Sequence, residues 1–152
     1  MSVTRDTPYA AFNFLVNLGQ GQEKEVQAGF SEVSGLNMEV TVAEYRPGNS
    51  AVNYVHKLPG IHKSGDVTLK RGVIGYQNLY DWIELARQGK AKDVKRTVTI
   101  QLQSEDRSET VVTWKLSGAM PIKWTGPTLT AKGGGDVAME ELVLSVEMVS
   151  QE

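Results

Sequence analysis

Apolar and polar residues alternate along most of the chain, which is typical of β-strands that bury one face. Short turn-forming stretches rich in Gly, Asn, Ser and Asp separate the alternating segments. These segments cover residues 12–18, 26–30, 97–103, 112–117 and 142–148. The pattern predicts a mainly β protein built from antiparallel strands.

Residues 95–118 are expected to form a long hairpin, because the polar run 104–108 lies between two alternating segments. One face of this hairpin must meet the core, since exposing it would leave a large apolar patch. That face holds Val98, Ile100, Leu102, Val112, Trp114 and Leu116. The opposite, polar face holds Thr97, Thr99, Gln101, Gln103, Thr113, Lys115 and Ser117.

Residues 76–89 are the one segment with a clear helical period. Its apolar side chains recur at the spacing of one helix face, at Leu79, Trp82, Ile83 and Ala86. Gly89 follows as a left-handed C-cap. One amphipathic helix among many strands predicts two packed antiparallel sheets, a sandwich or partial barrel, with the helix against one edge.

A second hairpin is expected at residues 37–60. Its turn lies at 46–49 and is of type II, because Gly48 tolerates a positive φ, and Pro59 with Gly60 should end the return strand. A two-stranded hairpin is marginal by itself in water, so it either folds onto its own sandwich or reaches onto a neighbouring subunit. Its candidate contact residues are Met38, Val40, Val42, Tyr45, Arg46, Asn49, Val52 and Tyr54.

Composition sets further bounds. The 152 residues fit a single domain spanning 1–152, and 40% hydrophobic with 22% charged residues is ordinary for a globular protein. A net charge of -2 argues against nucleic-acid binding, which needs clustered cations. The absence of cysteine excludes disulfides and thiolate chemistry. We expect neither a secretory signal nor a membrane span, since no apolar run approaches ~18 residues.

Residue types suited to chemistry do not assemble into a recognisable site. His56 and His62 lack further ligands of the right spacing for zinc. Adjacent Glu140 and Glu141 would point to opposite faces of a strand. Lys70 and Arg71 are expected on a solvated strand face. We therefore predict no catalytic, cofactor-binding or metal-binding residues.

Several segments together resemble a known family. They are PYAAFNFLVNLG at 8–19, AGFSEVSGLNMEV at 28–40, AEYRPGN at 43–49, KLPGIHKSGDVTLKRGV at 57–73, LYDWIELARQG at 79–89 and the closing AMPIKWTGPTLTA and VAMEELVLSVEMV. In this order and spacing, the chain resembles the inner-tube proteins of contractile phage tails. It looks closest to the version found in extracellular contractile injection systems, and it is similar in architecture to the hemolysin-coregulated tube proteins.

The resemblance implies a non-enzymatic structural subunit. It implies hexameric rings whose strands close into one barrel, and stacking of those rings into a tube inside a sheath. Sheath, baseplate and tube-terminator proteins would be the partners, with effector proteins or DNA as luminal cargo. Assembly would take place in the bacterial cytoplasm, within a virion-like or an extracellular or cell-anchored injection particle.

Two alternatives stay open at this point: a tube-initiator at the baseplate of the same machine, and a ligand-binding β-sandwich module. For the tube, we predict that the hairpin at 37–60 packs on an adjacent subunit. The polar face of the hairpin at 95–118 either lines the lumen or lies under the sheath. Of these two destinations we predict the lumen, with Lys115 offset by a nearby carboxylate.

Overall fold

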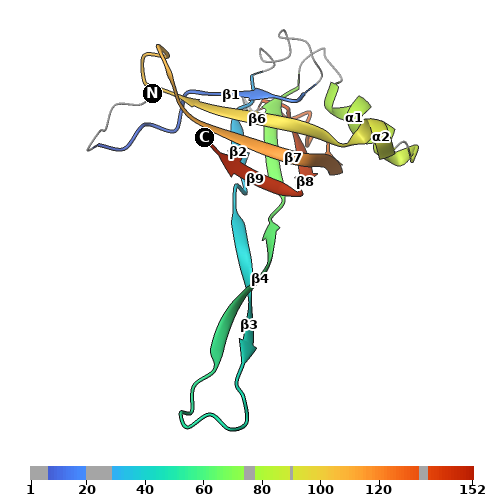
Figure 1. Cartoon of the computed structure of the whole chain (residues 1–152). Helices are drawn as coiled ribbons and strands as arrows, with labels where there is room; N and C mark the ends of the chain where they lie inside the picture. Colours follow the sequence, from blue (N-terminus) through green and yellow to red (C-terminus); the bar gives the residue numbers. More distant parts are fainter. Residues whose placement is uncertain (1–6, 20–28, 74–77, 90, 134–136) are drawn as a thin grey trace.

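A computed structural model of the chain describes residues 7–19, 29–73, 78–89, 91–133 and 137–152. The described part is mainly β, and its body is a continuous seven-stranded antiparallel sheet with strand order β1-β6-β7-β8-β5-β2, to which β9 adds by pairing with β7. A two-stranded hairpin, formed by β3 and β4, stands apart from this sheet (Figure 1).

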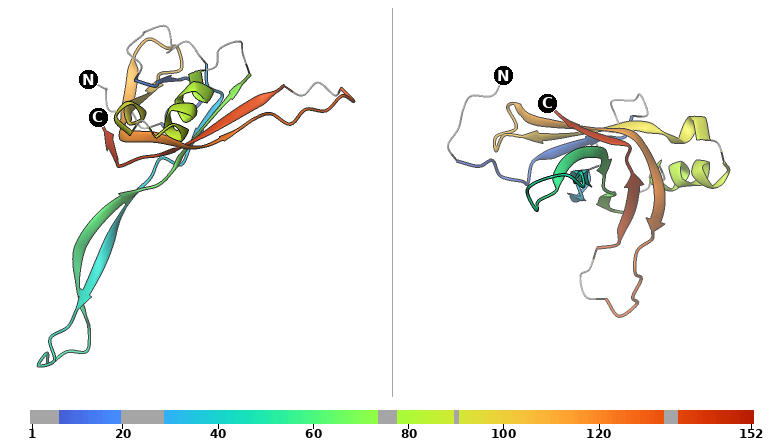
Figure 2. Two further views of the ribbon diagram at one scale, coloured as in Figure 1. Left: turned by 90° about the vertical axis from the view of Figure 1, so that its right-hand side faces the viewer. Right: turned by 60° about the horizontal axis from the view of Figure 1, so that its bottom comes forward.

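The seven-stranded sheet forms two layers because β7 (Thr110–Thr125) belongs to both. The first layer contains β1 (Phe14–Asn17), β6 (Arg96–Gln103) and β9 (Met148–Gln151), and the first half of β7 pairs with β6 and with β9. Its second half pairs with β8 of the second layer, which contains β2 (Glu32–Ser34), β5 (Val67–Gly72) and β8 (Met139–Ser145). Gly118, at a φ of 65°, lies where β7 passes between the layers, and the change in strand direction is visible in Figure 2.

The hydrophobic core fills the space between the two layers. It contains alternate residues from both, in the order expected of strands with one buried face. The buried members are Val16, Leu18, Val67, Leu69, Val98, Ile100, Leu116, Ala119, Leu142, Leu144 and Val146, joined by Leu79 and Trp82 of the helix. The predicted fold class of two packed antiparallel sheets is therefore confirmed. On the predicted apolar face of the hairpin at 95–118, the core takes Val98, Ile100 and Leu116, with Trp114 packed against it, whereas Leu102 and Val112 are only half-buried.

The predicted helix is α1 (Asn78–Arg87), and a short α2 (Ala91–Val94) follows it. Trp82 anchors both, because its indole Nε1 donates a hydrogen bond to the Val94 carbonyl oxygen at 2.7 Å. Gly89 has the left-handed φ of 77° expected of a C-cap. The expectation of a single helix missed α2, whose four residues are too few to show a period.

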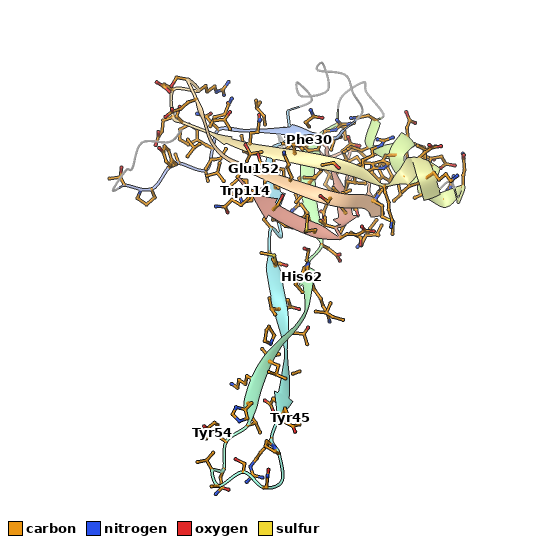
Figure 3. The ribbon with its side chains drawn as sticks, in the orientation of Figure 1. Phe30, Tyr45, Tyr54, His62, Trp114 and Glu152 are labelled. Carbon is orange, nitrogen blue, oxygen red and sulfur yellow. The ribbon has the colours of Figure 1, made fainter. Side chains whose placement is uncertain are left out.

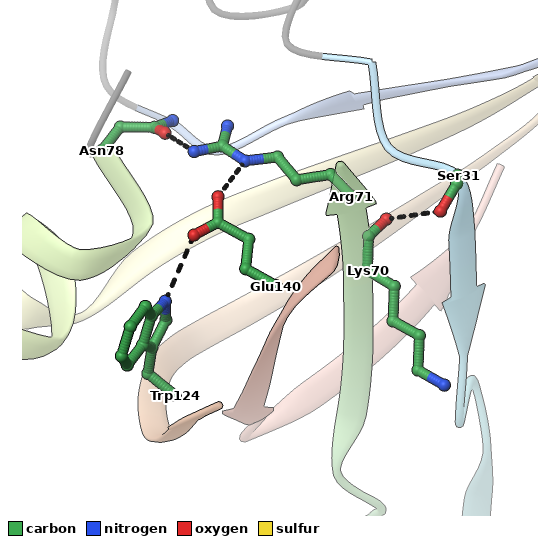
Figure 4. Close-up of polar contacts among 6 residues, drawn as sticks. All are labelled: Ser31, Lys70, Arg71, Asn78, Trp124 and Glu140. Atoms are coloured by element: carbon green, nitrogen blue, oxygen red, sulfur yellow. Dashed lines mark hydrogen bonds and ion pairs between the residues drawn. The ribbon is translucent and has the colours of Figure 1, made fainter. Parts of the chain in front are cut away.

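A buried ion pair lies within the second layer, and its arginine also hydrogen-bonds to α1 (Figure 4). Arg71 on β5 donates to Glu140 Oε1 on β8 through Nε at 2.6 Å, and to Asn78 Oδ1 through Nη2 at 2.5 Å. Trp124 Nε1 donates to the other oxygen of Glu140 at 3.4 Å. The expectation that Arg71 lies on a solvated face is wrong, since its side chain is 1% exposed. Lys70 does lie on the outer face, beside Glu32 and Glu141.

Some predicted boundaries need correction. Phe12 is exposed, and β1 begins only at Phe14. The segment at 142–148 is not one strand, because β8 ends at Ser145 and the chain turns to pair β9 with the first half of β7. The strand expected at 26–30 lies largely outside the described residues.

Candidate assembly surfaces

The hairpin of β3 (Met38–Tyr45) and β4 (His56–Ser64) projects away from the body as a long arm (Figures 1 and 2). Every residue of β3 is exposed, and so is all of β4 except the half-buried Ser64. Of the two destinations open from the sequence, folding onto the chain's own sandwich is therefore excluded. The arm contributes nothing to the core described above.

The candidate contact residues of the hairpin are uncovered. The side chains expected to make the apolar contact are 44–60% exposed, namely Met38, Val40, Val42, Tyr45, Val52 and Tyr54. Figure 3 shows Tyr45 and Tyr54 near the tip and His62 nearer the body. Tyr54 packs edge-on against His56, with ring centroids 5.7 Å apart. Asn49 is exposed in the tip loop.

Arg46 shapes the tip loop. Its Nε donates to the Val52 carbonyl oxygen at 3.2 Å, and its Nη2 lies 3.3 Å from the Ser50 carbonyl oxygen and 3.4 Å from Asn53 Oδ1. A guanidinium that bridges three points of one loop holds that loop in a single shape. Arg46 therefore positions the residues around it, including Val52.

Three details of this hairpin differ from the sequence-based expectation. Val52 lies in the loop and not on a strand. Gly48 has no positive φ, and the Ser50 amide donates to the Pro47 carbonyl oxygen at 3.1 Å, so the turn starts one residue later and is not of type II. β4 continues through Pro59 and Gly60, because an irregularity opposite Thr41 accommodates them. Leu58 and Ile61, which were not among the predicted contact residues, are also exposed on β4.

A tight joint connects the hairpin to the body. Gly35 has a φ of 89°, and a Cβ at this position would collide with the Asp66 carbonyl oxygen. The Gly65 amide donates to Asn37 Oδ1 at 2.7 Å across the same joint. These contacts fix the direction in which the arm leaves the sheet.

The residues predicted for the lumen share one face of the first layer. Register pairs Thr99 with Lys115 and Gln101 with Thr113, so these side chains point to the same side of the sheet. Glu152 lies 2.8 Å from Lys115 Nζ, which is the neighbouring carboxylate expected from the sequence. None of the seven predicted lumen residues is buried, which are Thr97, Thr99, Gln101, Gln103, Thr113, Lys115 and Ser117.

Other surfaces show little that suggests chemistry. A cleft of about 550 Å³ lies beside β8, lined by Thr125, Leu129, Val137, Met139 and Glu141 among others. Within the described ranges, no three His, Asp or Glu side chains are close enough together to hold a metal ion. Of the helices in that same part of the chain, none is both long enough and apolar enough to cross a membrane.

Comparison with known proteins gives a consistent result. Residues 10–150 match the model of the T4-like virus tail tube protein gp19 family. No curated protein sequence matches the chain. A structure of the anti-feeding prophage cap, a tube-terminating cap, is 27% identical with a TM-score of 0.82, and the match covers 100% of this chain and 95% of that one.

A structure of the sheath-tube complex of PVC, an extracellular contractile injection system, is 29% identical with a TM-score of 0.77, covering 97% of this chain and 93% of that one. Hcp1 from Flavobacterium johnsoniae shares the fold at 13% identity, with a TM-score of 0.52 and coverage of 91% and 93%. Neither a tube-initiator nor a ligand-binding module is favoured by these matches. Because the family model covers nearly the whole chain, this protein belongs to the T4-like virus tail tube protein family.

Proposed function

We propose that the chain is a non-enzymatic structural subunit of the inner tube of a contractile injection apparatus, in which hexameric rings stack into a rigid hollow tube. The observation that carries this proposal is the projecting hairpin. It exposes a series of large apolar side chains that the chain's own body leaves uncovered. Exposed apolar surface of this extent is typical of a protein–protein contact.

The partners follow from the same proposal. The tube lies inside a sheath, starts at a baseplate and ends at a terminator, and its lumen conducts effector proteins or DNA through a target envelope. Related proteins have been seen in a sheath-tube complex and in a terminating cap, which supports these partners. Subunits assemble in the bacterial cytoplasm and act in an extracellular or cell-anchored particle.

In this proposal the hairpin makes the contact between subunits. Burying each large apolar side chain contributes roughly 1.5–3 kcal/mol, so several such residues stabilise a ring or stack substantially. Deleting residues 43–54 and closing the gap with a short turn should leave a folded monomer, since the body's core contains no hairpin residue. Negative-stain microscopy should then show tubes from the unmodified protein and none from the variant. Normal tubes from the variant would refute the role of the hairpin.

The polar face of β6 and β7 lines the lumen in this proposal. Short uncharged side chains hydrate a channel without binding a passing chain strongly, and Glu152 offsets the charge of Lys115. The chain has no cysteine, so Thr99→Cys introduces a single thiol. In long tubes that thiol should react with a small maleimide entering from the ends and resist a bulky one. Equal labelling by both reagents would place Thr99 on the outer wall.

A further inference from the structure

The charged cross-strand pairs of the hairpin lie on opposite faces of its pleat. Glu39 is opposite Lys63 near the body, and Glu44 is opposite Lys57 near the tip. Successive residues of a strand point to opposite faces, so positions 39 and 44, five residues apart, cannot share one. A flat ribbon would therefore show one charged pair on each face.

The apolar residues follow the complementary arrangement. Near the body, Met38 and Val40 lie on the face opposite Glu39. Near the tip, Tyr45 and Leu58 lie on the face opposite Glu44, since Leu58 is paired with Ala43. Along each face, one half of the hairpin is thus apolar and the other half is charged.

Twist brings the matching halves together. In Figure 1, β3 lies to the left of β4 near the body and to the right of it near the tip, so the strands exchange sides along the arm. Two-stranded ribbons twist more than larger sheets, and the irregularity opposite Thr41 increases the local twist. An observer who faces one side of the arm therefore sees one pleat face near the body and the other near the tip. Both apolar groups point to one side, and both charged pairs point to the other.

We propose that the hairpin binds a second copy of this chain through one side only. We call this the apolar side, formed by Met38, Val40, Val42, Tyr45 and Leu58. The charged side, formed by Glu39, Lys63, Glu44 and Lys57, stays in contact with water. This inference rests on the proposed function and adds to it the orientation of the arm on its partner.

A second copy fits as the occupant because the body exposes apolar residues on a different surface. Leu129 and Val137 are 82% and 73% exposed beside the cleft next to β8, far along the chain from the hairpin. A contact between two different surfaces of one chain is heterologous, and repeating it produces rings or helical stacks instead of closed pairs. That is the symmetry of a tube.

Two pairs of adjacent positions, one pair on β3 and one on β4, provide the test. A benzophenone amino acid is placed at position 40 or 58 on the apolar side, and at the adjacent position 39 or 57 on the charged side as the matched control. Purified tubes of each variant are irradiated and the covalent products separated by mass. We expect covalent dimers from positions 40 and 58 and loss of that product at 39 and 57.

A second measurement covers variants in which the probe hinders assembly. Val40→Glu and Leu58→Glu should each abolish tubes, whereas the exchange Glu39→Lys with Lys63→Glu should preserve them. Equal cross-linking at all four positions, or loss of tubes in the charge exchange, would overturn one-sided docking while leaving the proposed function intact. Failure of the unmodified protein to form tubes would overturn the proposed function and this inference with it.

Discussion

Replacing Arg71 by Met is expected to destabilise the body strongly, because it breaks a buried ion pair on one side only. The substitution leaves the Glu140 carboxylate almost fully buried, with the Trp124 indole at 3.4 Å as a remaining donor. It also removes the hydrogen bond to Asn78 at the start of α1 and the guanidinium that lies 5.6 Å from the Phe30 ring centroid.

The size of the effect can be worked from these contacts. Removing one partner of a buried ion pair costs ~3–5 kcal/mol, since the other charge stays buried without compensation. A domain of this length loses roughly 2–4 °C of melting temperature per kcal/mol. We therefore expect the Arg71→Met variant to melt about 6–20 °C below the unmodified protein.

Lys70 provides a matched control on the neighbouring position of β5. Its side chain is 40% exposed and lies 3.4 Å from Glu32 and 4.0 Å from Glu141. Exposed pairs of this kind contribute ~0–1 kcal/mol, so Lys70→Met should shift the melting temperature by at most about 4 °C. Scanning calorimetry of dispersed subunits measures both variants.

A double variant tests the cause of the loss. Replacing the pair with apolar side chains, as in Arg71→Met with Glu140→Leu, should recover much of the stability that Arg71→Met loses. Equal melting temperatures for the Arg71→Met and Lys70→Met variants would refute the reasoning. So would a double variant less stable than Arg71→Met alone.

Two further predictions concern local structure. Hydrogen bonds from Ser108, and a further one from Ser104, lower the pKa of Asp106 to about 2 from its ordinary 3.8. The Asp106 carboxylate should therefore stabilise its loop fully above pH 3.8, and this contribution should be lost only as the pH falls through about 2. An NMR titration of Asp106 with a midpoint at 3.8 would contradict this expectation. Gly35→Ala should cost at least ~1–2 kcal/mol in urea unfolding because of its left-handed φ, whereas Gly48→Ala, whose added Cβ meets no atom within 4 Å, should be nearly neutral.

Most of the body could be predicted from the sequence because its strands bury one face. Alternation at 97–103 and 112–117 located β6 and the first half of β7, and it correctly placed Val98, Ile100 and Leu116 in the core. The same rule, applied further, would have found the buried ion pair. Arg71 follows Val67 and Leu69 at intervals of two residues, which is the parity of the buried face. A charge at such a position indicates a buried partner, which here is Glu140.

The candidate assembly surface was only partly predictable. Alternation identified a hairpin near residues 37–60, but it cannot tell whether an apolar face meets the chain's own core or another molecule. The length of the return strand was misjudged because Pro59 and Gly60 were expected to stop it, whereas an exposed two-stranded ribbon tolerates a missing donor and a local irregularity. The sequence did contain one sign of the change of apolar face along the arm. Val42 and Ala43 are adjacent apolar residues, and at this point the apolar positions of β3 move from one face of the pleat to the other.

The body is stabilised by contacts that do not involve the arm. Substitutions can therefore change the stability of the body and the assembly of subunits independently. The core draws on both layers and on α1 and takes nothing from β3 or β4, so changes on the arm should leave the body's melting temperature intact. Changes at Arg71 act on the body, which the arm needs as its base through the joint at Gly35 and Asn37. An arm that is uncovered in the single chain is stabilised mainly by what it binds, because a lone hairpin is marginal in water. In the proposed tube, the same exposed apolar side chains of the arm make the contact with the neighbouring subunit.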